Sequence, residues 1–96
     1  MKTIIIESKE DFQNYYNPNL NTYVFDSDLI IKCDLGYIDS SVKIRGNVAA
    51  YEDFIMEGYL ELEGAMYSDS KIEAGSDYIC SDLSVHPIAD YRFNSV

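Results

Sequence analysis

The sequence predicts a mainly β protein, a short parallel β-solenoid (β-helix) with an N-terminal strand–helix cap. Three observations carry this prediction. Short apolar alternations, broken by Gly, Asn, Asp and Ser, run from Tyr23 to Val85 without a convincing helical period. A short apolar pattern recurs within this stretch, and a second apolar series lies between its copies. The short apolar alternations begin only at Tyr23 and end at Val85. We therefore divide the chain into a cap (1–22), solenoid coils (23–85) and a C-terminal tail (86–96).

The cap is expected to hold one strand and one short helix. Residues 3–6 are mostly β-branched, which favours a strand. Ser8 can accept hydrogen bonds from the free N–H groups of a helix start, and the acidic residues behind it suit the helix dipole. The helix is expected over about residues 9–16, with the sequence Asn-Pro-Asn at 17–19 ending it. Its apolar face would comprise Phe12, Tyr15 and Tyr16.

The repeat has the template apolar, x, apolar, x, small, x, apolar. Its copies span residues 29–35, 42–48, 60–66 and 79–85, and the last copy is the weakest. The second series is evenly spaced and consists of Ile38, Ile55 and Ile72. Two interleaved series with nearly equal steps indicate coils of nearly constant length, each with more than one short strand.

Alternation places Val42, Ile44 and Val48 on one face of the chain and polar residues on the other. One coil cannot bury its apolar face alone, whereas coils stacked about 4.8 Å apart bury it continuously. Glycines such as Gly46 and Gly64 would allow the bends between strands. An antiparallel sandwich of about seven short strands remains the alternative.

The segments at 42–48 (VKIRGNV) and 60–66 (LELEGAM) resemble the coils of the bactofilin, or polymer-forming, family. The segment at 71–76 (KIEAGS) resembles coils of short β-helical proteins common on phages and mobile elements. The resemblance implies a right-handed parallel β-helix and carries no catalytic residues. The chain departs from bactofilins in having about three coils and a separate N-terminal cap.

Charge is the strongest compositional signal. The 96 residues are enough for one domain, and 17 carboxylates against seven Lys and Arg give a net charge of -10. Such a chain repels nucleic acid and anionic membranes, and it favours a basic protein partner. The alternative is that the acidity serves only solubility. No long apolar stretch indicates a signal peptide or a membrane span, so we expect a cytoplasmic protein.

The expected partner-binding surface combines carboxylates with some of the nine tyrosines, because Tyr is favoured at interfaces and can contact Arg. Glu61 or Glu63 could lie beside Lys43 and Arg45 of the preceding coil, and the acidity should grow toward the C-terminal half. The candidate residues are Glu52, Asp53, Glu57, Tyr59, Glu61, Glu63, Tyr67, Asp69, Glu73 and Asp77.

Signals for catalysis, metal binding or a cofactor are weak, so we expect none of them. His86 is the only histidine, and a lone histidine at a strand–turn position is a weak catalytic signal. Cys33 occupies the small position of its repeat, which favours a packing role, and Cys80 makes no metal-binding spacing with it. The carboxylates at 26–28 and 69–70 fit solvated turns better than a calcium loop.

These observations predict a non-enzymatic inhibitor or adaptor that binds a basic, nucleic-acid-handling surface, such as that of a CRISPR effector or another nuclease. In size and acidity the chain resembles the anti-CRISPR and anti-restriction proteins of phages, which act in the cytoplasm of a bacterial host cell. A bactofilin-like self-assembling structural protein is the alternative, and an enzyme acting on carbohydrate is a third hypothesis. We also expect a homodimer, with the tail that includes Tyr91 and Phe93 closing one end or docking on a second copy.

Overall fold

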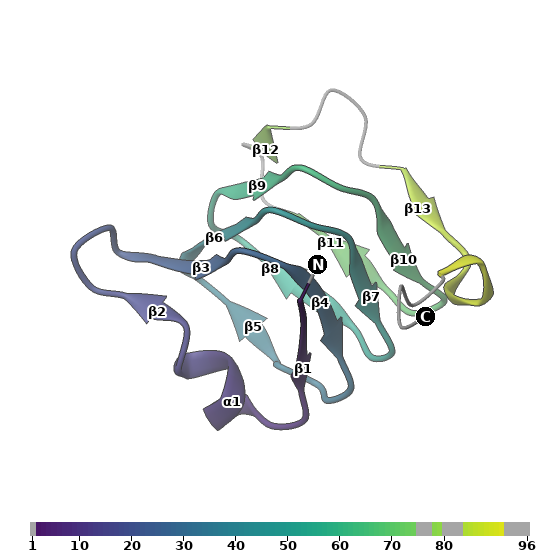
Figure 1. Ribbon diagram of the computed structural model, residues 1–96, viewed down its shortest axis with the longest axis horizontal. Coiled ribbons are helices and arrows are strands. Elements are labelled where there is room, and N and C mark those ends of the chain that lie inside the picture. The colour runs from purple at the N-terminus through teal and green to yellow at the C-terminus, as the bar shows by residue number, and fades with distance from the viewer. Residues whose placement is uncertain (1, 75–77, 80–83, 92–96) are drawn as a thin grey trace.

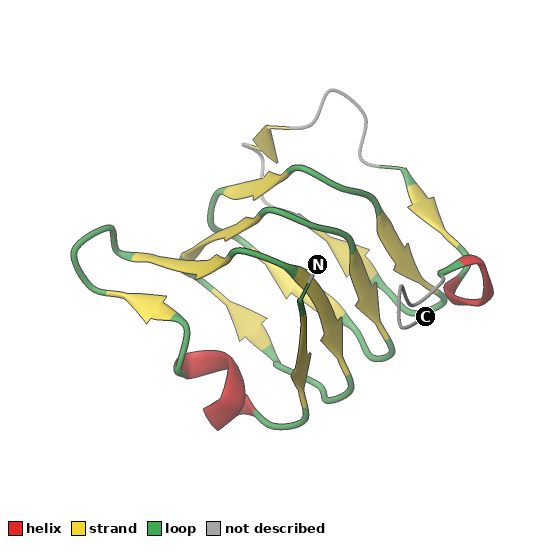
Figure 2. Ribbon diagram, viewed as in Figure 1, coloured by secondary structure: helices red, strands yellow, loops and turns green. Residues whose placement is uncertain are grey.

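The protein is mainly β, with three sheets built from short strands. The computed structural model describes residues 2–74, 78–79 and 84–91 (Figures 1 and 2). The N-terminal elements are β1 (Thr3–Ile6), α1 (Lys9–Gln13) and β2 (Tyr16–Asn17). The central strands are β3 (Thr22–Phe25), β4 (Asp28–Ile31), β5 (Tyr37–Ile38), β6 (Ser41–Ile44), β7 (Val48–Ala50), β8 (Phe54–Met56), β9 (Leu60–Leu62), β10 (Met66–Ser68) and β11 (Ile72–Glu73). The last elements are β12 (Tyr78–Ile79), β13 (Val85–His86) and the 3-10 helix η1 (Ile88–Asp90).

The strands fall into three sheets that the chain visits in turn. Sheet A has the order β1-β4-β7-β10-β13, sheet B has β12-β9-β6-β3-β2, and sheet C has β11-β8-β5. From β3 to β11 the chain passes through sheets B, A and C three times, in rounds at 22–38, 41–56 and 60–73 (Figure 1). Among the described strands every pairing is parallel except that of β2 with β3. The antiparallel sandwich is therefore excluded.

Side chains from all three sheets meet in one core. In β6 the burial alternates, with Val42 and Ile44 fully covered and Ser41 and Lys43 partly exposed. The same alternation places Phe54 and Met56 inside and turns Ile55 outward. This is the period-two pattern read from the sequence, and apolar burial along every round stabilises the stack.

The corner between sheets B and A shows why small and amide-bearing residues recur there. The Oδ1 atom of Asp28 accepts a hydrogen bond from the N–H of Asn47 at 2.8 Å, and the Oδ1 atom of Asn47 accepts one from the N–H of Ala65 at 2.9 Å. A Cβ added to Gly64 would lie 2.4 Å from the carbonyl oxygen of Gly46, one round earlier. The stacked backbones approach so closely that this corner admits only glycine at these positions.

The predicted cap strand is confirmed at Thr3–Ile6, whereas the cap helix is shorter than predicted. Ser8 caps the helix as expected, since its hydroxyl accepts the N–H of Asp11 at 3.2 Å. The helix ends at Gln13, however, and Tyr16 begins β2 instead of continuing the helical face. Phe12 carries the contact with the core, because its ring centroid lies 5.3 Å from that of Phe25. The N-terminal strand is not separate from the repeats, since β1 pairs with β4 at the edge of sheet A.

The structure corrects the predicted repeat registers. Leu29 was aligned with Val42, yet it lies in sheet A and pairs with Val48, whereas Val42 pairs with Tyr23 and Leu60 in sheet B. The last copy is displaced as well, because Tyr78 and not Ile79 pairs with Leu60. These registers were mispredicted because the apolar template fits any strand that faces the core, so it does not show to which sheet a strand belongs.

The isoleucine series is also displaced. Ile38 pairs with Met56 and not with Ile55, and Ile72 pairs with Phe54, so the true step in sheet C is longer than the spacing of the isoleucines. Counted between residues that pair across the rounds, the turn that joins β4 to β5 is one residue longer than the turn that joins β7 to β8 in the next round. This longer turn contains Gly36, which has a φ of 70°.

The C-terminal segment folds back on the outer face of sheet A. Tyr91 is 9% exposed and packs with Ile30 and Ala49, both fully buried, and with Ile88. The expectation that the tail closes an end or docks on a second copy is therefore wrong for Tyr91, while Phe93 lies outside the described residues. Ile30 and Ala49 face outward in their strands, and covering them removes an apolar patch from solvent. No helix within the described ranges is long and apolar enough to cross a membrane.

Candidate protein-binding surface

Acidity grows along the chain as predicted. Residues 1–48 carry seven carboxylates and five Lys or Arg, a balance of -2, whereas residues 49–96 carry ten carboxylates and two basic side chains, a balance of -8. The same difference holds in the described rounds, since residues 2–48 carry seven carboxylates and five basic side chains, whereas residues 49–73 carry seven carboxylates and one Lys. The negative potential of the protein is therefore strongest around the later rounds.

The structure brings three predicted residues together at the corner between sheets A and C. We call the β7–β8 turn (51–53) and the β10–β11 turn (69–71) the acidic corner. The two turns stack, because the hydroxyl of Ser70 donates to the carbonyl oxygen of Tyr51 at 3.1 Å and the N–H of Lys71 donates to Oδ1 of Asp53 at 3.0 Å. Glu52, Asp53 and Asp69 are all exposed there.

Two of these carboxylates also shape the backbone. Asp53 accepts the N–H of Lys71, and Oδ1 of Asp69 accepts the N–H of Ile88 at 3.2 Å. Glu52 has neither an ion pair nor a hydrogen bond within the described part of the chain. With Tyr51 44% exposed beside it, the corner offers a carboxylate and an aromatic ring to a guanidinium group.

Other predicted residues lie on different faces. Glu57 and Tyr59 are exposed in the turn between sheets C and B, and Glu73 is exposed in β11. Tyr67 is partly buried, with its ring centroid 5.3 Å from those of His86 and Tyr91. Asp77 lies outside the described residues. The nine predicted residues that the structure describes are thus spread over several faces of the stack, and among them only the acidic corner brings three together.

The expected charge pairing between rounds is confirmed for Glu61. Glu61 lies opposite Lys43 in the ladder of sheet B, and its Oε2 atom is 3.3 Å from the Nζ atom of Lys43. Arg45 instead pairs with Asp26 of the first round, at 3.1 Å from Nε to Oδ1. Glu63 therefore stays exposed without an ion pair among the described side chains.

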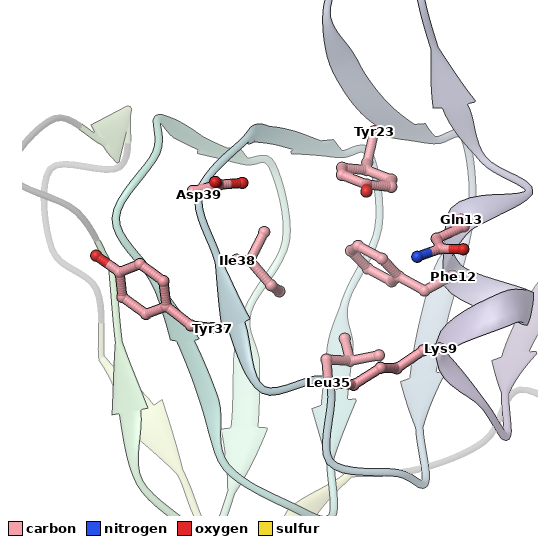
Figure 3. Close-up of a pocket in the computed structure, with 8 residues that line it drawn as sticks. All are labelled: Lys9, Phe12, Gln13, Tyr23, Leu35, Tyr37, Ile38 and Asp39. Atoms are coloured by element: carbon pink, nitrogen blue, oxygen red, sulfur yellow. The ribbon is translucent and has the colours of Figure 1, made fainter.

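A small pocket lies between α1 and β5 at the N-terminal end. It has a volume of about 250 Å³, with the apolar side chains of Phe12, Leu35 and Ile38 on its walls and the charged groups of Lys9 and Asp39 at its rim (Figure 3). Pockets that bind drug-sized ligands span about 300–1,000 Å³. This one suits an apolar side chain better than a cofactor, and it lies away from the acidic corner.

The residues considered for chemistry have local roles. His86 is exposed and stacks near Tyr67. Cys33 packs against the core from the β4–β5 turn, so its predicted equivalence with Gly46 and Gly64 is wrong. Burial, together with the nearby carboxylate of Asp11, raises the pKa of the Cys33 thiol, which favours its protonated form. Cys80 lies outside the described residues.

One polar contact was missed by sequence reasoning. Asp28 was taken as a solvated turn carboxylate, yet it is 5% exposed. The hydroxyl of Tyr91 donates to its Oδ2 atom at 3.3 Å across 63 residues of chain. Burial and the Asp28 charge raise the pKa of Tyr91 to about 12. Nothing in the local sequence marks this pair, because the two residues meet only after the tail folds back. No group of metal-ligating side chains forms within the described ranges.

A scan against protein-family models finds no match to this chain, and searches of the curated proteins and of the solved structures find none either. The functional argument therefore depends on the surface itself.

Proposed function

We propose that this protein is a non-enzymatic binding module whose acidic later rounds occupy a basic, nucleic-acid-binding surface of another protein. The observation that carries the proposal is the charge gradient, -2 for residues 1–48 and -8 for residues 49–96. Solubility alone requires charge but no gradient. Unpaired carboxylates beside exposed tyrosine, as at Glu52 and Tyr51, suit a partner rich in Arg.

The proposed architecture is a short right-handed parallel β-solenoid. Three observations support it: the repeated visits to sheets B, A and C, the parallel pairing between rounds, and the nearly constant step between paired residues of successive rounds. Such a scaffold is rigid and presents side chains in fixed columns. Carboxylates held on a rigid scaffold can compete with the phosphates of nucleic acid for the same basic groups.

The biological role that we propose is that of a phage or mobile-element inhibitor of the anti-CRISPR or anti-restriction type, acting in the cytoplasm of a bacterial host cell. Its target would be a CRISPR effector or another nuclease. The small size and the high acidity support this role.

The test is affinity purification with the tagged protein from a phage-bearing bacterial lysate. The matched bait carries Glu52→Gln, Glu57→Gln and Glu63→Gln, three exposed carboxylates without ion pairs in the described part of the chain. We expect the native bait alone to retain a nuclease that both salt and duplex DNA release. Equal capture by both baits, or capture that DNA does not compete, contradicts the proposal.

A second function is supported by the sheet edges. Sheet A ends in β1 on one side and in β13 on the other, so copies could stack head to tail as a self-assembling structural protein. Electron microscopy at high protein concentration tests this alternative. Filaments would support it, and discrete particles would contradict it.

A further inference from the structure

We propose that the open edge of β1 is a self-association surface, on which a second copy of this chain adds its own β1 in antiparallel orientation. This inference concerns assembly and stands independently of the proposed partner. Among the described strands, β1 is the terminal strand of sheet A and pairs only with β4 (Figure 1). Natural edge strands are usually protected by charge, proline or a bulge, and the Thr-Ile-Ile-Ile sequence of β1 has none of these.

The backbone of β1 leaves pairing groups on its open side. The carbonyl oxygen of Ile6 accepts the N–H of Lys32, which turns the Ile6 backbone toward β4. Because backbone direction alternates along a strand, Thr3 and Ile5 direct their N–H and C=O groups toward the open side. The N–H of Glu7, on the same side, is already bound by the carboxylate of Asp11 at 3.0 Å. The free stretch therefore centres on Ile5.

An antiparallel pair centred on Ile5 is self-complementary. Each Ile5 would exchange two hydrogen bonds with its copy, and Thr3 of one chain would lie opposite Glu7 of the other. Lys2 would then lie opposite Ser8 of the other chain, close to the acidic first turn of α1, which holds Glu10 and Asp11. Opposite charges at both ends of the paired strands fix this register over its alternatives.

The outer face of sheet A also continues across the proposed pair. Ile5 lies opposite Ile30 in the ladder, and Ile30 lies opposite Ala49. The C-terminal segment covers Ile30 and Ala49 completely, yet Ile5 remains 49% exposed. Two Ile5 side chains placed face to face would cover each other, which extends the buried row across the two-fold axis.

Charge repulsion favours dimerisation through the β1 edge over dimerisation through the C-terminal ends. Pairing through β1 brings together the two ends with a balance of -2, whereas pairing through the C-terminal ends would oppose two halves of -8. The two acidic ends would point away from each other, so the dimer could engage two basic partners. A pair of such short strands forms a small interface, for which we expect a dissociation constant of about 1 µM or weaker.

Sedimentation velocity of the full chain over about 1–200 µM provides the first test. We expect a monomer–dimer equilibrium that Ile5→Lys weakens by about tenfold or more and that Val85→Lys leaves unchanged. Val85 is the matched control because it is 42% exposed on β13, the opposite edge of sheet A. A monomer at all concentrations, or assembly lost through Val85→Lys, overturns the proposal, and the latter result indicates head-to-tail stacking.

Disulfide formation tests the register and needs no destabilising change. In a Cys33→Ser, Cys80→Ser background, Ile5→Cys should oxidise to a covalent dimer, because facing residues of an antiparallel pair are about 5.5 Å apart at Cα. Thr3→Cys alone should stay monomeric, whereas a mixture of the Thr3→Cys and Glu7→Cys chains should cross-link. Absence of the Ile5→Cys dimer, or equal cross-linking by Thr3→Cys alone, contradicts the register. Either failure leaves the capture of a basic partner unaffected, which separates this proposal from the function above.

Discussion

At the scale of single residues, the fold depends on close backbone contacts at its corners as well as on its buried side chains. A Cβ at Gly64 would lie 2.4 Å from the Gly46 oxygen and 2.5 Å from Oδ1 of Asn47, which are contacts that real Cβ atoms do not make. Neither Gly46 nor Gly64 has a positive φ, so glycine is required there because the space between rounds cannot hold a Cβ. A sequence alone shows the glycines but not which backbone approaches them.

We therefore expect Gly64→Ala to destabilise the protein by about 2 kcal/mol or more, since relief of the clash must separate two stacked rounds. Urea unfolding followed by circular dichroism measures the free energy of unfolding. Glu63→Ala is the control, because Glu63 is exposed and unpaired among the described side chains, and we expect it to stay within about 0.5 kcal/mol of the native value. A neutral Gly64→Ala would contradict the close stacking.

Tyr91 provides a prediction about pH. Its pKa is raised to about 12 in the folded protein, above the value of about 10 for an unfolded tyrosine. The folded state thus holds this proton more tightly, and the resulting stability is present below about pH 10 and is lost as the pH rises toward 12. Absorbance of tyrosinate near 295 nm should show a late-titrating group that Tyr91→Phe removes. An unchanged titration curve for Tyr91→Phe would contradict the contact with Asp28.

At the scale of elements, α1 stabilises the fold through a single anchor. Phe12 is 4% exposed and its ring lies 4.5 Å from Tyr23 and 5.3 Å from Phe25, centroid to centroid. So short a helix is not stable alone, and the packing of Phe12 holds it in place. We expect Phe12→Ala to cost about 3–5 kcal/mol and the exposed control Gln13→Ala less than about 0.5 kcal/mol in thermal or urea unfolding. Similar effects of both changes would show that α1 contributes little to covering the core.

The elements also show how far the sequence could predict this fold. Alternation identified β6 and β9 and their inward faces, and the helix cap at Ser8 was correct. Register was not predictable, because a one-residue change in a turn moves the next strand while leaving its alternation intact. Ile55 was predicted to be the counterpart of Ile38 and Ile72, yet its neighbours Met56 and Phe54 pair with them instead. The Lys43–Glu61 pair was predictable because charge and spacing agreed.

Of the candidate surface, only the negative charge was predictable from the sequence. The sequence identified the carboxylates and the tyrosines, and it predicted the gradient along the chain. It could not show which of them share a face, since that depends on the lengths of turns. Glu52 and Asp69 lie at the same corner because the β7–β8 and β10–β11 turns stack. The folding back of Tyr91 was likewise invisible, because a tail leaves no periodic signal.

At the scale of the whole molecule, a net charge of -10 on a chain with a radius of gyration of 12.2 Å must oppose compaction. Salt screens charges over about 10 Å at 0.1 M, a distance comparable to the size of the molecule. We expect the thermal midpoint to rise by about 4 °C or more between low and moderate salt, which corresponds to roughly 1 kcal/mol. A midpoint that does not depend on salt would show that the charges are too dispersed to repel.

The same repulsion separates the two explanations of the acidity. In the Glu52→Gln, Glu57→Gln, Glu63→Gln variant three negative charges are removed from the acidic end, so we expect a higher thermal midpoint at low salt than in the native protein. If the carboxylates lower the stability of the protein, their retention indicates a role in binding rather than in folding. We therefore expect the stabilised variant to lose the captured partner. A variant that gains stability and keeps its partner would mean that the acidity maintains solubility alone, and binding would then have to be sought on the apolar edge of β1 or in the pocket beside α1.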